Sequence, residues 1–153
     1  LRPDGRGTVR LASPDPLAPP AILFDYLRTD YDMQAVVFGI RLARRIAAQP
    51  ALLPYVAEEL APGRAVETDA ELADYVRRSG VSNQHPTSSC AMGHGPNAVV
   101  DPRLRVHGVQ ALRVVDASIM PTMVSGNTNA ASIMIGEKGA AMILEDLRAQ
   151  IAA

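Results

Sequence analysis

The residue types best suited to chemistry gather in the stretch from Asn83 to Gly93, which reads NQHPTSSCAMG. His85 stands directly before Pro86, which biases its backbone toward an extended conformation and can hold the imidazole at a strand end facing a cleft. A neutral imidazole is a base near neutral pH, so this side chain could take a proton from a substrate. A histidine among polar residues is also a common structural or surface residue. Both interpretations of His85 stay open on this stretch alone.

Cys90, the only cysteine of the chain, lies in the same stretch. A Cys/His pair can perform nucleophilic catalysis, but the sequence supplies no partner to orient it, and a lone cysteine is more often a small buried apolar residue. One cysteine allows no disulfide within the chain and no multi-cysteine metal site. His85, His94 and His107 also lack the i, i+4 spacing of a helical metal motif. The sequence therefore argues against metal catalysis.

A second group of candidate residues lies between Leu112 and Ala131. A strand over Leu112–Val115 would place the Asp116 carboxylate at its carboxyl end, where ligands collect in α/β proteins. The residues Gly126–Asn129 then supply capping groups to a final helix. They could form an ordinary N-cap, or the free N–H groups and the helix dipole could bind an anion. The stretch itself favours neither alternative.

The elements that must position these groups are short, because 12 prolines and 11 glycines interrupt the chain. Alternating patterns predict strands over 7–12 and 21–26, joined by a proline-rich loop, and further strand character over 99–100, 104–106 and 112–115. Apolar residues at i, i+3, i+4 and i+7 predict an amphipathic helix from Asp32 to near Gln49.

Two further helices are predicted after that one. The sequence Thr68-Asp69-Ala70-Glu71 has the pattern of a capping box and predicts a helix start. The last helix begins near 128–130. Its expected apolar face consists of Ile133, Ala140, Ala141, Leu144, Leu147 and Ile151.

Composition limits the class of protein. The 153 residues, 48% of them hydrophobic, fit one compact globular domain, and the net charge of −1 offers no basic surface for nucleic acid or anionic lipid. No window reaches 18 consecutive apolar residues, so we expect no membrane insertion. We expect a soluble, cytoplasmic protein. Because the chain begins with Leu1, apparently within a strand, we also expect it to be a piece of a longer protein.

The order and spacing of five blocks carry a family resemblance. The blocks are His85-Pro86, Cys90–Gly93, Val99–Pro102 with Leu104–Val109, Leu112–Pro121, and Gly126–Ala130. Together they closely resemble the carboxyl-terminal region of the glucose-methanol-choline (GMC) flavoprotein oxidoreductases. The opening residues 1–7 and the helix from Asp32 are similar to the start of the same region, so the resemblance spans nearly the whole chain.

The resemblance implies an α+β fold: the substrate-binding part of a GMC flavoprotein, an antiparallel sheet with flanking helices, plus a carboxyl-terminal strand–helix segment that packs on an FAD-binding domain. Residues 1–153 would then be the substrate and active-site region. The FAD-binding domain would precede it as the chain's partner, since no G-x-G-x-x-G motif is present. Without that half, the chain should neither hold FAD tightly nor be active.

The resemblance also implies residue roles. His85 matches the active-site histidine that accepts the hydroxyl proton of a small-molecule alcohol while hydride passes to flavin N5, and Asn127 matches the position that hydrogen-bonds the substrate oxygen. The positions matching FAD contacts are Asp116, Ala117, Thr128, Asn129 and Ala130. Asn83 and Gln84 would line the substrate pocket, whereas His94 and His107 match no catalytic position and are expected to be loop or solvent residues.

One departure from the family pattern affects this site. Ser88–Ala91 replaces the Gly-Thr-Cys-Arg found in many members, so an arginine is absent and local contacts must differ. Two alternatives to an alcohol oxidoreductase stay open: a flavin-containing hydroxynitrile lyase of the same fold, and a non-catalytic fragment.

Overall fold

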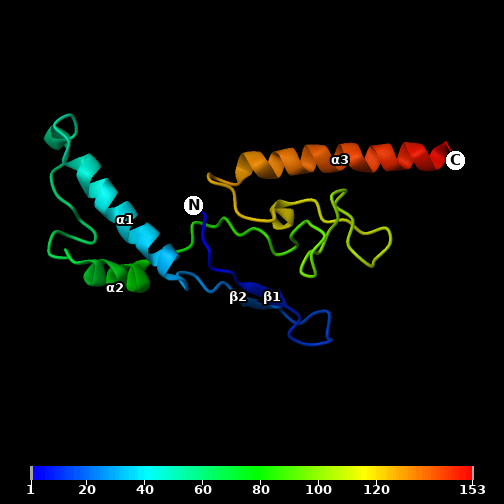
Figure 1. Ribbon diagram of the computed structural model, residues 1–153, viewed down its shortest axis with the longest axis horizontal. Coiled ribbons are helices and arrows are strands. Elements are labelled where there is room, and N and C mark those ends of the chain that lie inside the picture. The colour runs from blue at the N-terminus through cyan, green and yellow to red at the C-terminus, as the bar shows by residue number, and fades with distance from the viewer. Residues whose placement is uncertain (1, 153) are drawn as a thin grey trace. The chain divides into compact units, whose positions relative to one another are not determined.

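The computed structural model describes residues 2–152, which form two compact units (Figure 1). The N-terminal unit contains residues 3–82, and the C-terminal unit contains Arg2 and residues 83–152. Each unit has its own buried apolar residues. The chain length predicted one compact domain. The structure instead divides the chain just before the stretch that carries His85.

The N-terminal unit opens with a two-stranded antiparallel hairpin, β1 (Thr8–Arg10) and β2 (Ala21–Leu23), in which Val9 pairs with Ile22. Both strands lie within the predicted ranges 7–12 and 21–26, but each is only three residues long. Every residue of both strands is exposed. An isolated hairpin of this size is marginally stable in water, so its attachment to the rest of the unit matters.

Asp32 provides that attachment. Its buried carboxylate accepts hydrogen bonds from the backbone N–H of Asp4, at 2.8 Å, and of Gly5, at 2.9 Å. Burial raises the pKa of Asp32, but these bonds and those from Thr29 outweigh it, so the pKa lies below its ordinary value. A Cβ at Gly5 would lie 2.8 Å from the carboxylate, so the tight approach requires glycine.

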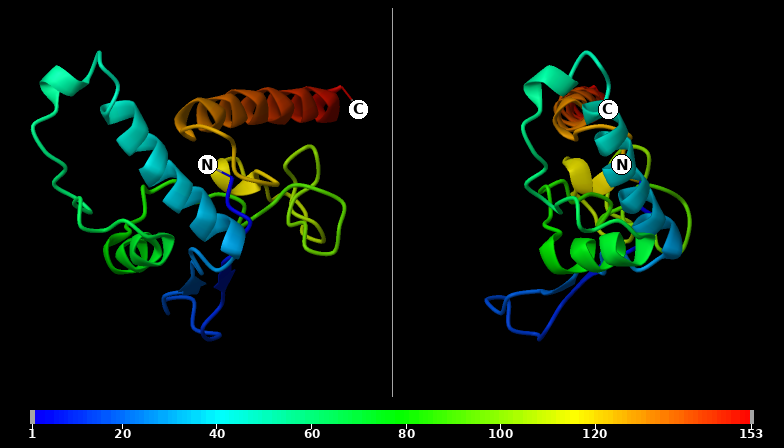
Figure 2. Two further views of the ribbon diagram at one scale, coloured as in Figure 1. Left: turned by 60° about the vertical axis from the view of Figure 1, so that its left-hand side comes forward. Right: turned by 90° about the vertical axis from the view of Figure 1, so that its left-hand side faces the viewer.

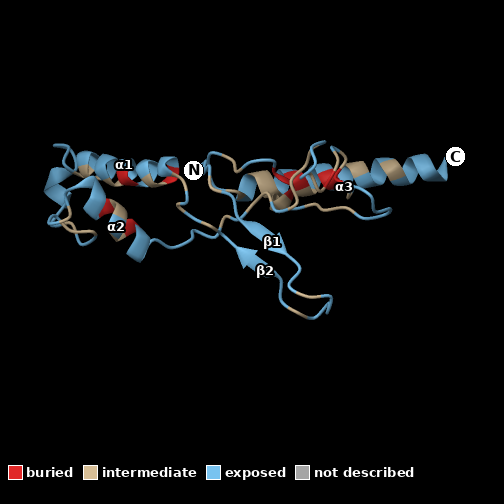
Figure 3. Cartoon of the chain, turned by 60° about the horizontal axis from the view of Figure 1, so that its bottom comes forward, coloured by how far each residue is buried: buried red, intermediate tan, exposed pale blue. Residues whose placement is uncertain are grey.

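Helices α1 (Asp30–Ala47) and α2 (Asp69–Ser79) pack against each other (Figure 2). The buried residues of this unit all fall on these helices, and the apolar ones are Val37, Leu72 and Val76 (Figure 3). The structure confirms the capping box at Thr68, whose side chain accepts from Glu71 N–H. Helix α1 begins and ends two residues earlier than predicted.

Arg44 fixes the connection between the two helices, which includes the short 3-10 helix η1 (Leu53–Tyr55). Its half-buried guanidinium donates to Glu59 at 2.8 Å. It also donates to the carbonyls of Gly63, at 3.1 Å, and Val66, at 2.9 Å. One side chain of α1 thus holds three points of the loop that returns to α2.

In the C-terminal unit, residues 99–115 differ from the prediction of three strands. They form isolated bridges instead, in which Val100 pairs with Val106 and Arg105 pairs with Arg113. Leu104 and Ala111 have φ values of 66° and 58°, in the left-handed region, so the backbone cannot stay extended past each bridge. Val100 and Leu104 are nevertheless buried in the core of this unit, together with Ile119, Met120 and Ile135.

Helix α3 (Asn129–Ile151) begins where the sequence predicted, but its expected apolar face is not the one that packs on this unit. The residues of α3 that are buried are Ile135 and Gly139. The face predicted from Ile133, Ala140, Ala141, Leu144, Leu147 and Ile151 is exposed. The close approach of the loop at Val115 explains why α3 packs through Gly139. A Cβ at Gly139 would lie 2.3 Å from Val115 Cγ1, so the glycine lets the loop pack directly on the helix.

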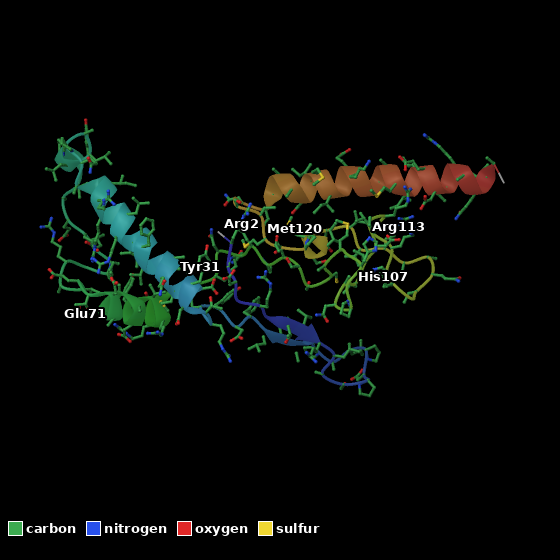
Figure 4. All side chains as sticks on the ribbon, viewed as in Figure 1. Arg2, Tyr31, Glu71, His107, Arg113 and Met120 are labelled. Carbon is green, nitrogen blue, oxygen red and sulfur yellow. The ribbon has the colours of Figure 1, made fainter. Side chains whose placement is uncertain are left out.

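Ion pairs attach the same loop to the C-terminal half of α3 (Figure 4). Arg103 donates to Asp146 at 2.6 Å, and Arg113 donates both to Asp146 and to the Arg103 carbonyl. The hydrogen bond from Arg113 is the main reason that the pKa of Asp146 lies below its ordinary value. Within residues 2–152, no helix has a stretch long and apolar enough to cross a lipid bilayer.

We predict that Gly139→Ala destabilises the protein. Although alanine favours a helix, its Cβ would overlap the stiff Val115 side chain, and such overpacking costs about 1–3 kcal/mol. Gly136→Ala is the matched control, because a Cβ at Gly136 meets no atom within 4 Å. Thermal unfolding should show a lower midpoint for Gly139→Ala than for Gly136→Ala. Equal midpoints would contradict the packing described for α3.

Candidate active site

Backbone hydrogen bonds bring two of the sequence motifs together in the C-terminal unit. Cys90 N–H donates to the Ser118 carbonyl at 2.9 Å, and Met92 N–H donates to the Ile119 carbonyl at 2.8 Å. A longer bond of 3.4 Å joins Ser88 N–H to the Ala117 carbonyl. The segment after His85 therefore lies beside the segment that follows Asp116. The two are about 30 residues apart in the sequence.

His85 lies in an irregular segment between two strained backbones. Gln84 and Ser88 have φ values of 57° and 72°, which non-glycine residues adopt at a cost of about 1–3 kcal/mol each. Such conformations persist only where the surrounding structure imposes them, and the bond from Ser88 N–H to the Ala117 carbonyl contributes to this at Ser88. The imidazole is half-buried, and its Nδ1 lies 3.3 Å from Thr128 Oγ1. This contact joins the third motif to the first.

The N-terminus of α3 differs from those of the other two helices. Thr128, its N-cap residue, makes no side-chain capping bond, and the first turn holds no acidic residue. Thr29 and Thr68 cap α1 and α2 with their hydroxyl groups, and each of those helices has two acidic residues in its first turn. The first N–H groups of α3 and its positive dipole end are thus available to an anion.

The sequence predicted that Asp116 lies at the end of a strand, and this prediction is wrong. Asp116 is the N-cap of the 3-10 helix η2 (Ala117–Ile119), and its carboxylate accepts from Ser118 N–H at 2.7 Å. An aspartate placed before a turn readily bonds its own backbone two residues on, which explains the difference. Asp116 is exposed and Ala117 is half-buried, so both lie at the surface of this segment.

The other predicted site residues are less constrained. Asn127, Asn129 and Ala130 are exposed around the start of α3, and Asn83 is exposed ahead of His85. Within the described chain, no hydrogen bond fixes the side chain of Asn83 or Asn127. The structure thus joins His85 directly to Thr128 but fixes Asn127 only through its place in the chain.

The remaining histidines and the cysteine do not form a reactive group. His94 and His107 are exposed, as expected, and Cys90 is half-buried. Across residues 2–152, no group of three or more His, Cys, Asp or Glu side chains is placed to hold a metal ion.

Sequence reasoning missed one anchor near the site. Arg2 Nε donates to Ser125 Oγ at 2.7 Å and so fixes the loop that leads to Asn127. No local pattern links two residues 123 positions apart, so the sequence carried no signal for this bond.

The family model for GMC oxidoreductase matches residues 3–136. The chain belongs to the GMC oxidoreductases. The oxygen-dependent choline dehydrogenase of Acinetobacter baumannii (strain AYE) is 50% identical to this GMC chain over 138 residues, 90% of this chain and 25% of the relative. The chain therefore spans about a quarter of the length of the curated relatives it matches.

Solved structures agree with this assignment. A fungal aryl-alcohol oxidase is 36% identical with a TM-score of 0.84 over 97% of this chain and 25% of its own. An FAD-dependent oxidoreductase from Chaetomium thermophilum is 33% identical with a TM-score of 0.86 over 97% of this chain and 26% of its own. The GMC oxidoreductases are FAD-dependent flavoproteins, and the α+β architecture predicted from the resemblance is confirmed.

The capping role of Asp116 yields a test with a matched pair of variants. Asp116→Ala removes the acceptor for Ser118 N–H and should destabilise this GMC segment by about 0.5–2 kcal/mol. Asp116→Asn keeps a side-chain oxygen in the same place and should retain most of the stability. Thermal unfolding of the two variants measures the difference. If Asp116→Asn were as unstable as Asp116→Ala, the charge rather than the cap would matter.

Proposed function

We propose that this chain is the carboxyl-terminal, active-site part of an FAD-dependent enzyme that oxidises the CH–OH group of a small-molecule alcohol to a carbonyl. The observation that carries the proposal is the position of His85. A half-buried imidazole, flanked by the left-handed backbones of Gln84 and Ser88, contacts the start of a helix whose N-terminus lacks a side-chain cap. In the proposed enzyme, a base would lie next to a group that stabilises an anion.

The residues present fit FAD as the cofactor. The start of α3, at Thr128, Asn129 and Ala130, offers backbone N–H groups without a competing carboxylate, and would hold the pyrimidine side of the flavin. Its dipole would stabilise negative charge there. Asp116 and Ala117 would contact the ribityl and pyrophosphate part. FAD, when bound, supplies the acceptor for the hydride that leaves the alcohol carbon.

The side chains of this chain would handle the proton and the oxygen. His85, as a neutral imidazole, would accept the hydroxyl proton. Asn127 would donate a hydrogen bond to the alkoxide that develops, without competing for its proton. Asn83 and Gln84, which precede His85, would line the substrate pocket. Because several curated relatives are named choline dehydrogenases, choline is the first alcohol to test.

We also propose that the rest of a longer polypeptide supplies the FAD-binding portion and covers the exposed face of α3. Ile133 is 60% exposed, Leu144 is 52% exposed and Leu147 is 49% exposed, which is much apolar surface for one helix. The share of the relatives' length that this chain spans supports the same proposal. The cytoplasmic location expected from the sequence stays a prediction.

His85→Ala in the complete flavoprotein should lower the rate of anaerobic flavin reduction by about 10²–10⁴-fold, because the general base is lost. FAD content should stay unchanged. His94→Ala is the matched control, since His94 is exposed in a neighbouring loop, and this variant should reduce its flavin at the wild-type rate. Stopped-flow absorbance measures both rates. An unchanged rate in His85→Ala would remove the residue from the role of base.

Asn127→Ala should retain FAD but slow flavin reduction by about 10²–10³-fold, as expected for loss of one donor to a developing oxyanion. The same stopped-flow measurement, with the flavin content determined from the absorbance spectrum, checks this. If the variant instead lost FAD and showed a normal rate after reconstitution, Asn127 would serve cofactor binding rather than the substrate oxygen.

A further inference from the structure

We propose that Thr128 is a positioning residue for His85: its hydroxyl oxygen accepts the Nδ1–H of the imidazole and so leaves Nε2 unprotonated, facing the substrate. The inference rests on the proposed function of His85 as a base. It assigns a task to the Thr128 side chain. The backbone N–H groups at the start of α3 remain available to the cofactor.

The Thr128 hydroxyl does not cap its own helix. Thr29 and Thr68 occupy the same N-cap position in α1 and α2, with extended backbones at ψ 152° and 157°, and each hydroxyl group accepts from the helix N–H three residues on. Thr128 instead has a helical backbone, with φ −80° and ψ −10°. Capping requires the extended conformation, so the Thr128 hydroxyl is directed elsewhere.

The Thr128 hydroxyl lies beside the imidazole of His85. Thr128 Oγ1 is 3.3 Å from His85 Nδ1, and both residues are half-buried. The Thr128 carbonyl accepts from the Ser132 N–H at 2.9 Å and from the Ser132 hydroxyl at 2.8 Å, so α3 holds the residue in place. His85 lies between the left-handed backbones of Gln84 and Ser88, and Ser88 N–H donates to the Ala117 carbonyl. The contact therefore joins a residue held by α3 to one whose segment is held beside residues 117–119.

The direction of the hydrogen bond between His85 and Thr128 determines which imidazole nitrogen can act as a base. A neutral imidazole carries its proton on one nitrogen and accepts through the other. If Nδ1–H donates to Thr128, Nε2 keeps its lone pair and can take a proton from an alcohol. Once Nε2 is protonated, Nδ1–H still donates to the same oxygen, so Thr128 serves both states. The threonine hydroxyl is neutral and does not compete for the transferred proton.

The test compares Thr128→Val, which keeps the shape but removes the acceptor, with Thr128→Ser, which keeps the hydroxyl. In the complete flavoprotein, with choline as the probe, Thr128→Val should lower the limiting rate of anaerobic flavin reduction by about 10–100-fold, the effect typical of losing a group that orients a functional histidine. The apparent dissociation constant for the alcohol should change little. Thr128→Ser should recover most of the rate. A structural defect alone would not show this rescue.

A double-variant cycle separates positioning from other roles. In the His85→Ala background, Thr128→Val should have no further effect on the rate, because there is no imidazole left to orient. Additive effects would overturn the inference, as would loss of FAD in Thr128→Val with a normal rate after reconstitution. If Thr128→Val fails to fold, Thr128→Ala takes its place in the cycle.

The outcomes also distinguish the inference from the proposed function. If His85→Ala slows flavin reduction and the Thr128 variants do not, the inference fails and the proposed function stands. If His85→Ala leaves the rate unchanged, the proposed function itself fails, and the inference fails with it.

Discussion

The backbone hydrogen bonds between residues 88–92 and 117–119 are the interaction on which the candidate site depends. They join the segment that follows His85 to η2, which precedes α3 in the chain. Ile119 and Met120, at the end of η2, are buried, so the pairing is attached to the apolar core of the C-terminal unit. A shift of either segment by one residue would move the imidazole away from the start of the helix.

Helix α3 packs firmly along its middle and C-terminal half, whereas its first turn lacks a side-chain cap. Around Gly139 it packs closely on Val115 and Leu104, and further on Asp146 receives Arg103 and Arg113. These contacts fix the direction of the helix. At its N-terminus, the helix lacks the side-chain cap and the first-turn acidic residues that α1 and α2 both have. The packed part of α3 thereby supports an N-terminus that has no side-chain cap and no acidic residue in its first turn.

Local signals in the sequence predicted the helices well, because caps and periodicity depend on neighbouring residues. The capping box at Thr68 and the start of α3 are examples. The prediction of strands over 99–115 was wrong, because the left-handed backbones at Leu104 and Ala111 follow from packing rather than from residue type. The apolar periodicity of α3 did not indicate which residues pack on the unit, because a small residue, Gly139, is the point of closest contact. Periodicity counts large apolar residues and overlooks such a position.

For the site, the order of the motifs identified His85 and Asn127 as candidates and placed Thr128 among the cofactor contacts. The 3.3 Å contact between Thr128 and His85 was not predictable, because it depends on two segments 43 residues apart meeting in the fold. Asp116 likewise looked like a residue at a strand end, whereas its carboxylate caps the turn that follows. Motif order thus supplied the candidate residues, and only the three-dimensional structure related their side chains to one another.

The most direct test of the central claim is the absorbance spectrum of the complete flavoprotein, recorded without oxygen before and after choline and a panel of other primary alcohols are added. We expect one alcohol to bleach the oxidised-flavin bands, with the corresponding carbonyl compound as product. A flavin that stays oxidised while a substrate is cleaved would contradict this expectation, because the scaffold would then support lyase chemistry instead of alcohol oxidation.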